Sequence, residues 1–349
     1  MPNRISTPGT EDDIHWMRLA IDEARKGLGA TSPNPPVGAV IVKGGCFLAK
    51  GHHQKAGMPH AEIEAIQTAD PADLIGATLY VTLEPCSTRG KTGACTTLIK
   101  KTGIRRVVIG CLDPNPKHSG KALKILNRAE IETTTGVLEK DCRNLIRFFA
   151  KHVTTRRPYV IAKTGMTLDG RIAPPPGGSQ WITGEKARRD VQRLRSRVDA
   201  ILVGGETVRR DDPALTLRGE FAPTNRPQPW RVVVTRSGRI PKRSKLLSDE
   251  FSDRTKVFHV EHLGPVLDEL GEMDVTCVLL ECGGRLMAQA FEEQLVDEIT
   301  FYIAPLIGGG SRRAVEGKNF RCQVVDPRIQ PVGPDMRVSA KVVYPESEE

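Results

Sequence analysis

The hydrophobic and polar positions of this chain alternate between two spacings, one typical of amphipathic helices and one typical of buried strands. In the first half the pattern predicts a helix over 14–24, a strand pair at 39–42 and 47–48, a helix that begins at Pro59, strands at 78–83, 106–111 and 131–135, and helices around 95–103, 123–126 and 145–149. This order predicts an α/β fold in which one sheet lies between two layers of helices.

The second half shows another alternating series that is not a copy of the first. It predicts strands at 159–162, 200–203, 231–235 and 275–281, a helix that Thr183 caps and that presents Val191, Leu194 and Val198, and a helix through Leu286, Ala290, Phe291 and Leu295. A polar stretch at 154–158 separates the two series. Because 349 residues exceed what one core usually serves, we expect two domains, residues 1–155 and 156–349.

Composition narrows the class of protein. The 39% hydrophobic and 27% charged residues are ordinary for a globular chain. No run approaches the ~20 apolar residues of a membrane span, and residues 1–13 hold no apolar signal core, so we expect a cytoplasmic protein without membrane contact. The net charge of +9 is spread along the chain with only 5% aromatic residues, which argues against nucleic acid and favours small phosphorylated ligands.

Eight cysteines in a chain without a signal peptide are expected to be reduced, buried or metal-bound rather than paired. Two of them, Cys86 and Cys95, combine with His60 into a set of one imidazole and two thiolates. Such a set suits a tetrahedral zinc ion whose fourth position is left to water, as in catalytic sites. Glu62 lies two residues after His60, at the expected helix start, where it can accept a proton from that water.

The order His-x-Glu, then Pro-Cys, then a second Cys is the signature of zinc nucleobase deaminases, here with a wider gap between Cys86 and Cys95. Each half of the pattern also has a plainer explanation. A Pro-His pair at a helix start with a nearby Glu arises by chance, and two cysteines beside a glycine-rich loop are often buried small hydrophobic residues. The two halves together, in this order, favour zinc.

Two strand-to-glycine turns in the second half predict a nucleotide site. Gly283 and Gly284 free backbone N–H groups at the start of a helix, where a diphosphate binds. The pair Gly204-Gly205 follows another predicted strand in the same way, and Glu281 at a strand end is placed for a sugar hydroxyl. Taken singly, each turn is more typical of glycines that pack inside an ordinary α/β domain.

With these residues laid out, the chain resembles the bifunctional pyrimidine deaminase-reductase family of riboflavin biosynthesis over nearly its whole length. The matching motifs of the first half are Asn34-Pro-x-Val-Gly38, Gly51-x-His53, Gly57-x-Pro-His-Ala-Glu62, Thr82-Leu-Glu-Pro-Cys86, Gly90-Lys-Thr92, Cys95 and Asp113-Pro-Asn-Pro116. Those of the second half are Lys163, Leu168-Asp-Gly-Arg171, Ser179-Gln-Trp-Ile-Thr183, Ala187-Arg-x-Asp190, Asp211-x-Pro-x-Leu-Thr216, Arg218, Glu281-x-Gly-Gly284 and Tyr302-x-Ala-Pro-Leu-x-Gly-Gly309.

The resemblance implies a cytidine-deaminase-like three-layer αβα sandwich followed by a dihydrofolate-reductase-like α/β domain. It implies two reactions. The first is zinc-dependent hydrolytic deamination of 2,5-diamino-6-(5-phosphoribosylamino)pyrimidin-4(3H)-one to 5-amino-6-(5-phosphoribosylamino)uracil. The second is NADPH-dependent reduction of the ribosyl group of that product to a ribityl chain.

The resemblance also implies roles for single residues. We further expect the protein to be a homo-oligomer. In the first domain His60, Cys86 and Cys95 hold zinc, Glu62 moves protons, and Asn34, His53 and Lys91 bind the substrate. In the second domain the substrate would face Lys163, Ser179, Arg195, Leu215, Arg218 and Glu281. NADPH would face Gly165, Trp181, Thr207, Asp211, Gly283, Gly284, Arg285, Leu286, Met287, Ala288 and Gln289.

Two further cations are expected from their place in the chain. Arg89 lies near Lys91 on the loop between the two cysteines, so we expect both to hold the substrate phosphate. Arg236 follows the strand at 231–235 and is expected to bind the 2′-phosphate of NADPH. The family pattern usually has a His where this chain has Thr88-Arg89, Pro-Pro where it has Gly93-Ala94, and a small residue in place of Cys282.

Two other functions remain open to the residues alone. A nucleoside or tRNA deaminase fused to an unrelated domain predicts a basic aromatic surface and does not need the turn after Glu281. A binding module, in which a degenerate deaminase senses a pyrimidine nucleotide, does not need Glu62 beside the ligands. Zinc content measured together with NADPH consumption separates these alternatives from the bifunctional enzyme.

Overall fold

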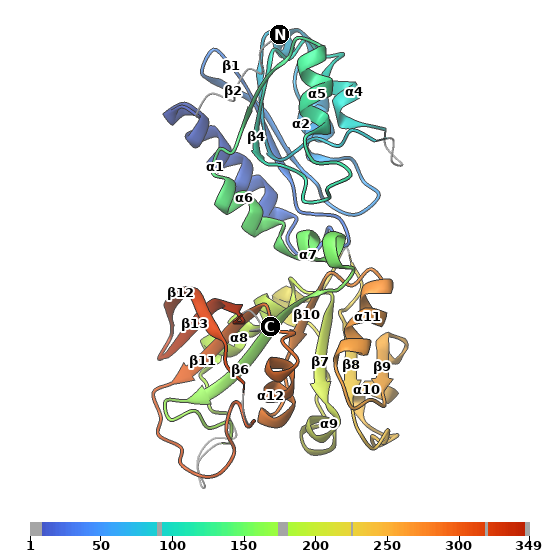
Figure 1. The fold of residues 1–349 in the computed structure, drawn as a ribbon, viewed down its shortest axis with the longest axis vertical. Coiled ribbons are helices and arrows are strands. Elements are labelled where there is room, and N and C mark those ends of the chain that lie inside the picture. The colour runs from blue at the N-terminus through green and yellow to red at the C-terminus, as the bar shows by residue number, and fades with distance from the viewer. Residues whose placement is uncertain (1–8, 89–92, 174–180, 225, 318–319, 346–349) are drawn as a thin grey trace. The chain divides into compact units, whose positions relative to one another are not determined.

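A computed structural model describes residues 9–88, 93–173, 181–224, 226–317 and 320–345. The chain forms two compact units, Met1–Thr155 and Arg156–Glu349 (Figure 1). Among the described helices there is none with the length and apolar character needed to cross a membrane.

The first unit is built on a five-stranded sheet with the order β2-β1-β3-β4-β5. Its strands are β1 Gly38–Lys43, β2 Cys46–His52, β3 Thr78–Leu83, β4 Arg106–Cys111 and β5 Glu132–Thr135. Strand β1 runs antiparallel to both β2 and β3, whereas β3, β4 and β5 are parallel. The parallel strands therefore end at one edge of the sheet, and the segments after β3 and β4 begin there.

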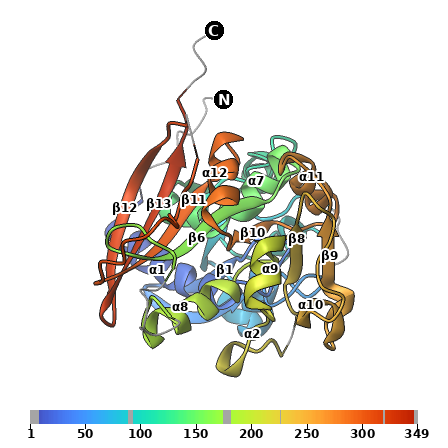
Figure 2. The same ribbon diagram turned by 90° about the horizontal axis from the view of Figure 1, so that it is seen from below.

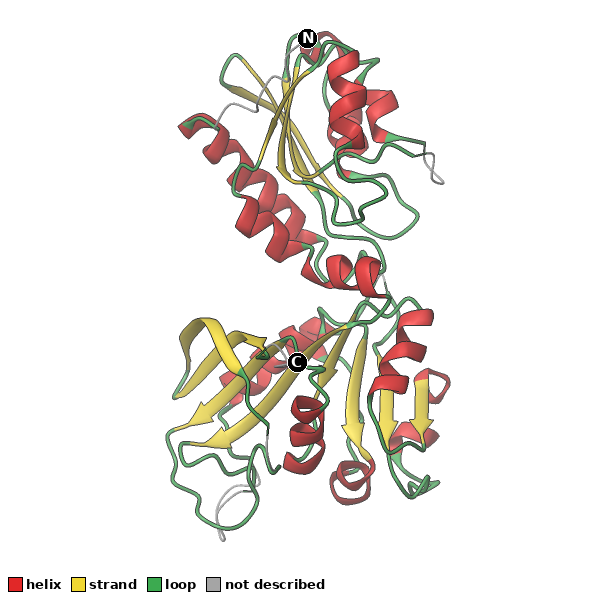
Figure 3. Ribbon diagram, viewed as in Figure 1, coloured by secondary structure: helices red, strands yellow, loops and turns green. Residues whose placement is uncertain are grey.

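Helices cover both faces of this sheet. They are α1 Glu11–Lys26, α2 Ala61–Thr68, α3 Pro71–Leu74, α4 Cys95–Ile99, α5 Lys121–Arg128, α6 Glu139–Leu145 and α7 Arg147–Thr155. Helices α1 and α6 lie on one face, and α2, α4 and α5 lie on the other (Figure 3). The three-layer αβα sandwich expected from the sequence is confirmed.

Helix α1 shows how the sequence produces one of these layers. Thr10 and Asp13 form a capping box, in which each side chain accepts a hydrogen bond from the backbone N–H of the other residue. The helix buries Met17 and Ala24 among others, and it ends at Gly27. Asp13 is itself buried and also ties α1 to β4, because it accepts two hydrogen bonds from Arg106 at 2.8 and 3.0 Å.

The second unit contains an eight-stranded sheet with the order β12-β13-β11-β6-β10-β7-β8-β9. Its strands are β6 Tyr159–Thr167, β7 Ala200–Gly204, β8 Trp230–Val234, β9 Thr255–Phe258, β10 Cys277–Leu280, β11 Glu298–Ala304, β12 Gln323–Val332 and β13 Asp335–Val343. The six strands from β11 to β9 are parallel, and β13 and β12 add an antiparallel hairpin. Figure 2 shows β6 beside β10 and β8 beside β9, and β7 lies between β10 and β8 in the sheet.

Both faces of the parallel part of this sheet are packed. The helices are α8 Glu185–Arg195, α9 Gly205–Asp211, α10 Lys245–Ser248, α11 Gly264–Glu272 and α12 Gly284–Glu292. Residues of α11 and α12, such as Leu267 and Met287, share a core with Val278 of β10. Val191 of α8 packs with Tyr302 in a separate cluster. Burial on both sides explains why these strands are continuous apolar runs in the sequence.

Several local predictions were wrong. Helix α4 ends at Ile99 and α12 at Glu292, whereas the pattern had predicted helices that reach residues 103 and 295. The helix expected around 145–149 is two helices, since α6 ends at Leu145 and α7 begins at Arg147. Pro59 does not begin α2, because His60 has extended backbone angles and is the N-cap. Gly184, not Thr183, precedes α8, and no side chain caps that helix. The N–H of Gly184 instead donates to Asp335, which is distant in sequence.

Candidate functional site

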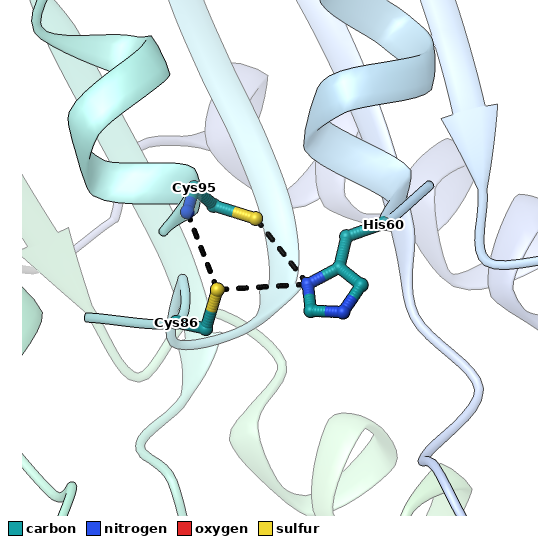
Figure 4. A group of neighbouring side chains, drawn as sticks. All are labelled: His60, Cys86 and Cys95. Atoms are coloured by element: carbon teal, nitrogen blue, oxygen red, sulfur yellow. Dashed lines mark hydrogen bonds between the residues drawn. The ribbon is translucent and has the colours of Figure 1, made fainter. Parts of the chain in front are cut away.

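The predicted zinc ligands converge at the edge of the first sheet. His60 is the N-cap of α2, Cys86 lies three residues after β3, and Cys95 is the first residue of α4. Nδ1 of His60 lies 3.6 Å from Sγ of Cys86 and 3.3 Å from Sγ of Cys95 (Figure 4). All three ligand atoms lie within 4.8 Å of one another.

These distances fit a tetrahedral zinc ion. With Zn–N at about 2.0–2.1 Å and Zn–S at about 2.3 Å, ligand atoms at the corners of a tetrahedron are about 3.5–3.8 Å apart. The backbone N–H of Cys95 also donates to Sγ of Cys86 at 3.2 Å, which stabilises a thiolate there. Among the described residues, the cluster consists of one imidazole and two thiolates without a fourth ligand, and such an open site is what catalytic zinc requires.

The charges of this cluster favour metal binding. The hydrogen bond with Cys95 and the nearby His60 lower the pKa of Cys86 against the effect of burial, which favours a thiolate at Cys86. The pKa of Cys95 is raised, because a second thiolate beside Cys86 is unfavourable. Glu62 is 3% exposed, and burial raises the pKa of its carboxyl group. A positive ion at the cluster would offset both penalties.

Asn34 and His53 lie beside this cluster. Nδ2 of Asn34 is 3.1 Å from Nε2 of His53, and Nδ1 of His53 is 3.0 Å from the carbonyl oxygen of Pro59. Burial lowers the pKa of His53, so its ring is neutral and donates from Nδ1 while it accepts at Nε2. The His53 and His60 rings are 5.3 Å apart. Lys91 and Arg89 lie outside the described residues.

The second unit has a cavity of about 2260 Å³ at the carboxyl ends of its parallel strands. It is lined by all but two of the residues predicted for the reductase, namely Lys163, Gly165, Trp181, Arg195, Thr207, Asp211, Leu215, Arg218, Arg236, Glu281, Gly283, Gly284, Arg285, Leu286, Ala288 and Gln289. The two are Met287, which is fully buried in the core beneath α12 and does not line the cavity, and Ser179, which lies outside the described residues.

One wall of the cavity carries a group of three charged side chains. Nε and Nη2 of Arg195 lie 2.6 and 3.0 Å from the carboxylate oxygens of Glu281, and Nζ of Lys163 lies 3.2 Å from the same carboxylate. Burial by itself would raise the pKa of Glu281, but Arg195 and Lys163 hold it at about 2. The carboxylate thus fixes two cations that face the cavity.

The glycines of the two turns have different roles. A Cβ atom on Gly284 would lie 2.2 Å from the carbonyl oxygen of Arg313, so this glycine is needed for packing. A Cβ atom on Gly283 would meet nothing within 4 Å, so the N-terminus of α12 opens onto free space. That opening, at a helix start that lines the cavity, fits the diphosphate of NADPH.

Sequence reasoning missed Gln192 and Tyr302 as cavity residues. Oε1 of Gln192 is buried and has no hydrogen-bond partner among the described residues, so it is available to a ligand. The Tyr302 hydroxyl donates to Asp190 at 2.7 Å, which fixes the ring. Gln192 stands one helical turn before Arg195, and that spacing was the available signal. Cys282 does not line the cavity and packs against the core.

Comparison with known proteins matches a different family to each half of the chain. Residues 158–338 match the family described as RibD C-terminal domain, and residues 10–111 match the cytidine and deoxycytidylate deaminase zinc-binding region. Riboflavin biosynthesis protein RibD of Aquifex aeolicus is 39% identical over 86% of this chain and 88% of its own length. RibD of Escherichia coli strain K12 is 36% identical over 87% and 90%.

Solved structures agree over a larger part of the chain. Form 1 of RibD from Acinetobacter baumannii superposes with a TM-score of 0.86 at 36% identity, covering 95% of this chain and 99% of that one. A diaminohydroxyphosphoribosylaminopyrimidine deaminase/5-amino-6-(5-phosphoribosylamino)uracil reductase from Thermotoga maritima superposes with a TM-score of 0.85 at 34% identity, with the same coverage.

Proposed function

This chain belongs to the RibD family of bifunctional deaminases and reductases of riboflavin biosynthesis, and we propose that the two sites described above divide the two reactions between them. The first reaction is hydrolytic deamination of 2,5-diamino-6-(5-phosphoribosylamino)pyrimidin-4(3H)-one. The second reduces the ribosyl group of the resulting uracil to a ribityl chain with NADPH. We assign deamination to residues 1–155 and reduction to residues 156–349.

In the deaminase, His60, Cys86 and Cys95 would hold the zinc ion. When bound, zinc lowers the pKa of a water molecule from about 15.7 to about 7 and so supplies the nucleophile. Glu62 would take a proton from the attacking water and deliver it to the ring nitrogen, and would then carry the proton of the added hydroxyl group to the departing amine. Its burial supports this role, because a carboxylate whose pKa is raised accepts a proton more readily than a solvated one does.

The pyrimidine of the substrate would be held by Asn34 and His53. His53 is fixed by the Pro59 carbonyl, so the Asn34 amide oxygen is free to accept from the ring while its nitrogen donates to His53. We assign the phosphate to Lys91 and Arg89, which lie on the loop between the two cysteine ligands.

In the reductase, the substrate would contact Lys163, Ser179, Arg195, Leu215, Arg218 and Glu281. NADPH supplies the hydride, and the N-terminus of α12 at Gly283 would hold its diphosphate. The other cofactor residues would be Gly165, Trp181, Thr207, Asp211, Arg236, Gly284, Arg285, Leu286, Ala288 and Gln289, while Met287 is left to the core. What the protein contributes to hydride transfer is alignment of the two reactants and exclusion of water.

One observation carries the deaminase assignment: a buried Glu62 stands two residues from a ligand in a cluster with one imidazole and two thiolates. The test supplies the diaminopyrimidine phosphate to the purified protein and measures zinc content, ammonia release and NADPH oxidation together. We expect about one zinc per chain and NADPH oxidation that depends on prior deamination. A protein that releases no ammonia from this substrate while it holds zinc would overturn the assignment.

We also propose a cytoplasmic location and a homo-oligomer. All eight cysteines are free thiols, which is typical of reducing compartments. Strand β12 lies at the edge of its sheet and exposes Val324 and Ile329, which a second copy would cover. Sedimentation at several protein concentrations tests the second proposal, and a monomer at all of them would refute it.

A further inference from the structure

Glu84 is a buried carboxylate that the two reactions described above do not use. It follows β3 directly, stands two residues before the ligand Cys86, and is 5% exposed. No Lys, Arg or His within the described ranges pairs with it. Its partners are instead three backbone N–H groups, those of Asp113 at 3.1 Å, Gly120 at 2.9 Å and Ala122 at 2.9 Å.

All three donors belong to one segment, which consists of the loop between β4 and α5 and the first turn of α5. Because β3 and β4 are parallel neighbours, this loop leaves the same edge of the sheet as the loop that carries Cys86. The backbone N–H of Glu84 also donates to the carbonyl oxygen of Cys111, the last residue of β4, at 2.9 Å. Glu84 therefore holds both ends of the segment 112–122 against the loop that carries a zinc ligand.

The segment is compact and polar where it faces this edge. Oδ1 of Asp113 accepts from the N–H of Asn115 at 2.8 Å, and the carbonyl oxygen of Asn115 accepts from the N–H groups of His118 and Ser119. Asp113 lies two residues after β4, and its backbone N–H donates to Glu84, which is two residues before the ligand Cys86. The segment therefore begins at the edge of the sheet where the metal cluster lies.

We propose that Glu84 is a positioning residue of the deaminase, which holds the segment 113–119 in the shape that the substrate binds. A loop that is already ordered in its bound shape loses little conformational entropy when the substrate binds. The contribution of Glu84 therefore appears in the affinity for the substrate. The inference rests on the proposed deaminase function, because the ligand that the segment would bind is the substrate of that reaction.

The first variant is Glu84→Gln, which keeps the shape of the side chain. Its amide has one oxygen, so the –NH₂ group must face one of the three N–H donors, and that contact is repulsive. We expect the KM for the diaminopyrimidine phosphate to rise about tenfold with kcat within about twofold, the result of losing a contact worth the same in ground and transition states. Zinc content and reduction of the deaminated substrate should be unchanged.

The second variant is Gly120→Ala, which alters the backbone of the same segment and leaves the Glu84 side chain itself unchanged. Gly120 has a φ of 74°, and an added Cβ would meet nothing within 4 Å, so only the backbone preference changes. Gly76→Ala is the matched control, because Gly76 has a φ of 80° and equal free space but precedes the opposite end of β3. We expect Gly120→Ala to raise KM several-fold and Gly76→Ala to leave it unchanged.

The outcomes separate this inference from the proposed function. A wild-type protein that does not deaminate the substrate would refute the function itself. If the wild type is active but Glu84→Gln and Gly120→Ala both keep its KM, or if Gly76→Ala raises KM as much as Gly120→Ala, Glu84 serves stability alone and the inference is overturned. Should Glu84→Gln fail to fold, the two glycine variants decide.

Discussion

Arg195 and Glu281 form a bidentate ion pair that joins α8 to the end of β10, with N···O distances of 2.6 and 3.0 Å. The side chains are 13% and 10% exposed, so the pair is largely removed from water. Lys163 on β6 shares the same carboxylate. Three separate elements thus meet at one carboxylate, which makes Glu281 both a structural centre and part of the proposed substrate site.

Glu281→Gln should weaken both functions of this centre. Removing one partner of a buried pair leaves Arg195 uncompensated, which costs about 3–5 kcal/mol of stability. We also expect a rise of at least tenfold in the reductase KM for its pyrimidine substrate. Glu269→Gln, which breaks an exposed pair with Lys256, is the control and should change neither quantity. A stable variant with normal KM would contradict the assignment.

The ion pair also sets a pH dependence. The pKa of Glu281 is about 2 in the folded protein, against its ordinary value of 4.5. Its contribution to the free energy of unfolding is therefore complete above about pH 4.5 and is lost as the pH falls from 4.5 towards 2. We therefore expect no acidic limb from Glu281 in the reductase KM between pH 5 and pH 8. A limb in this range that disappears in Glu281→Gln would show that the carboxylate titrates there.

Glu62→Gln should keep zinc and abolish deamination, because the amide preserves the shape of the side chain but cannot accept a proton. We expect a loss of roughly 10²–10⁴-fold in kcat for deamination, with reduction unaffected. Glu64→Gln is the matched control on the same helix, since that carboxylate accepts from the His52 backbone and the Gln54 side chain. Near wild-type ammonia release by Glu62→Gln would exclude Glu62 as the proton carrier.

Cys95→Ser should lose the metal, because a cluster with three ligands cannot spare one and a hydroxyl is a poor replacement for a thiolate. Metal analysis of the purified variant should find well under one zinc per chain, with reduction intact. Cys46→Ser, at an exposed free cysteine, should retain the wild-type zinc content. Equal zinc in both variants would show that Cys95 is not a ligand.

Asp13→Asn should destabilise the first unit, since Asp13 accepts from Arg106, Tyr80 and Thr10. Burial opposes ionisation of Asp13, but these donors lower its folded pKa below the ordinary 3.8. The contribution of Asp13 to the free energy of unfolding is thus complete above about pH 4, and it decreases as the pH falls through the pKa of Asp13 in the folded protein. Urea unfolding should show a loss of about 2–3 kcal/mol at pH 6 that shrinks near pH 3. A loss independent of pH would contradict this.

Arg236→Ala should reduce the preference for NADPH over NADH. Arg236 lines the cavity after β8, and its carbonyl oxygen contacts Nε2 of His259, which holds the backbone there. Losing a charged contact with the 2′-phosphate should raise the KM for NADPH about tenfold and leave that for NADH unchanged. Arg239→Ala, outside the residues that line the cavity, is the control. An unchanged preference would assign the 2′-phosphate to another cation.

The regular elements were predictable where burial decides them. The strands predicted at 78–83 and 106–111 are β3 and β4 with the same bounds, because a strand covered on both faces is apolar at most of its positions. Helix ends were less predictable. The cap of α8 depends on Asp335, 151 residues from Gly184, and that contact exists only after the chain has folded. The helix propensity of nearby residues cannot predict a partner that is so distant in sequence.

The sequence by itself determined the chemistry of both sites, because ligand types, an adjacent Glu62 and glycine turns at strand ends are properties of residues and spacing. Only the tertiary structure decided which of these residues face the two sites and which contact other parts of the chain. Met287 lies in the predicted cofactor segment but faces the core, since one helix has a buried side and an open side. Glu84 stands in a zinc-site motif yet binds the backbone of another loop, because the parallel pairing of β3 and β4 brings that loop beside it.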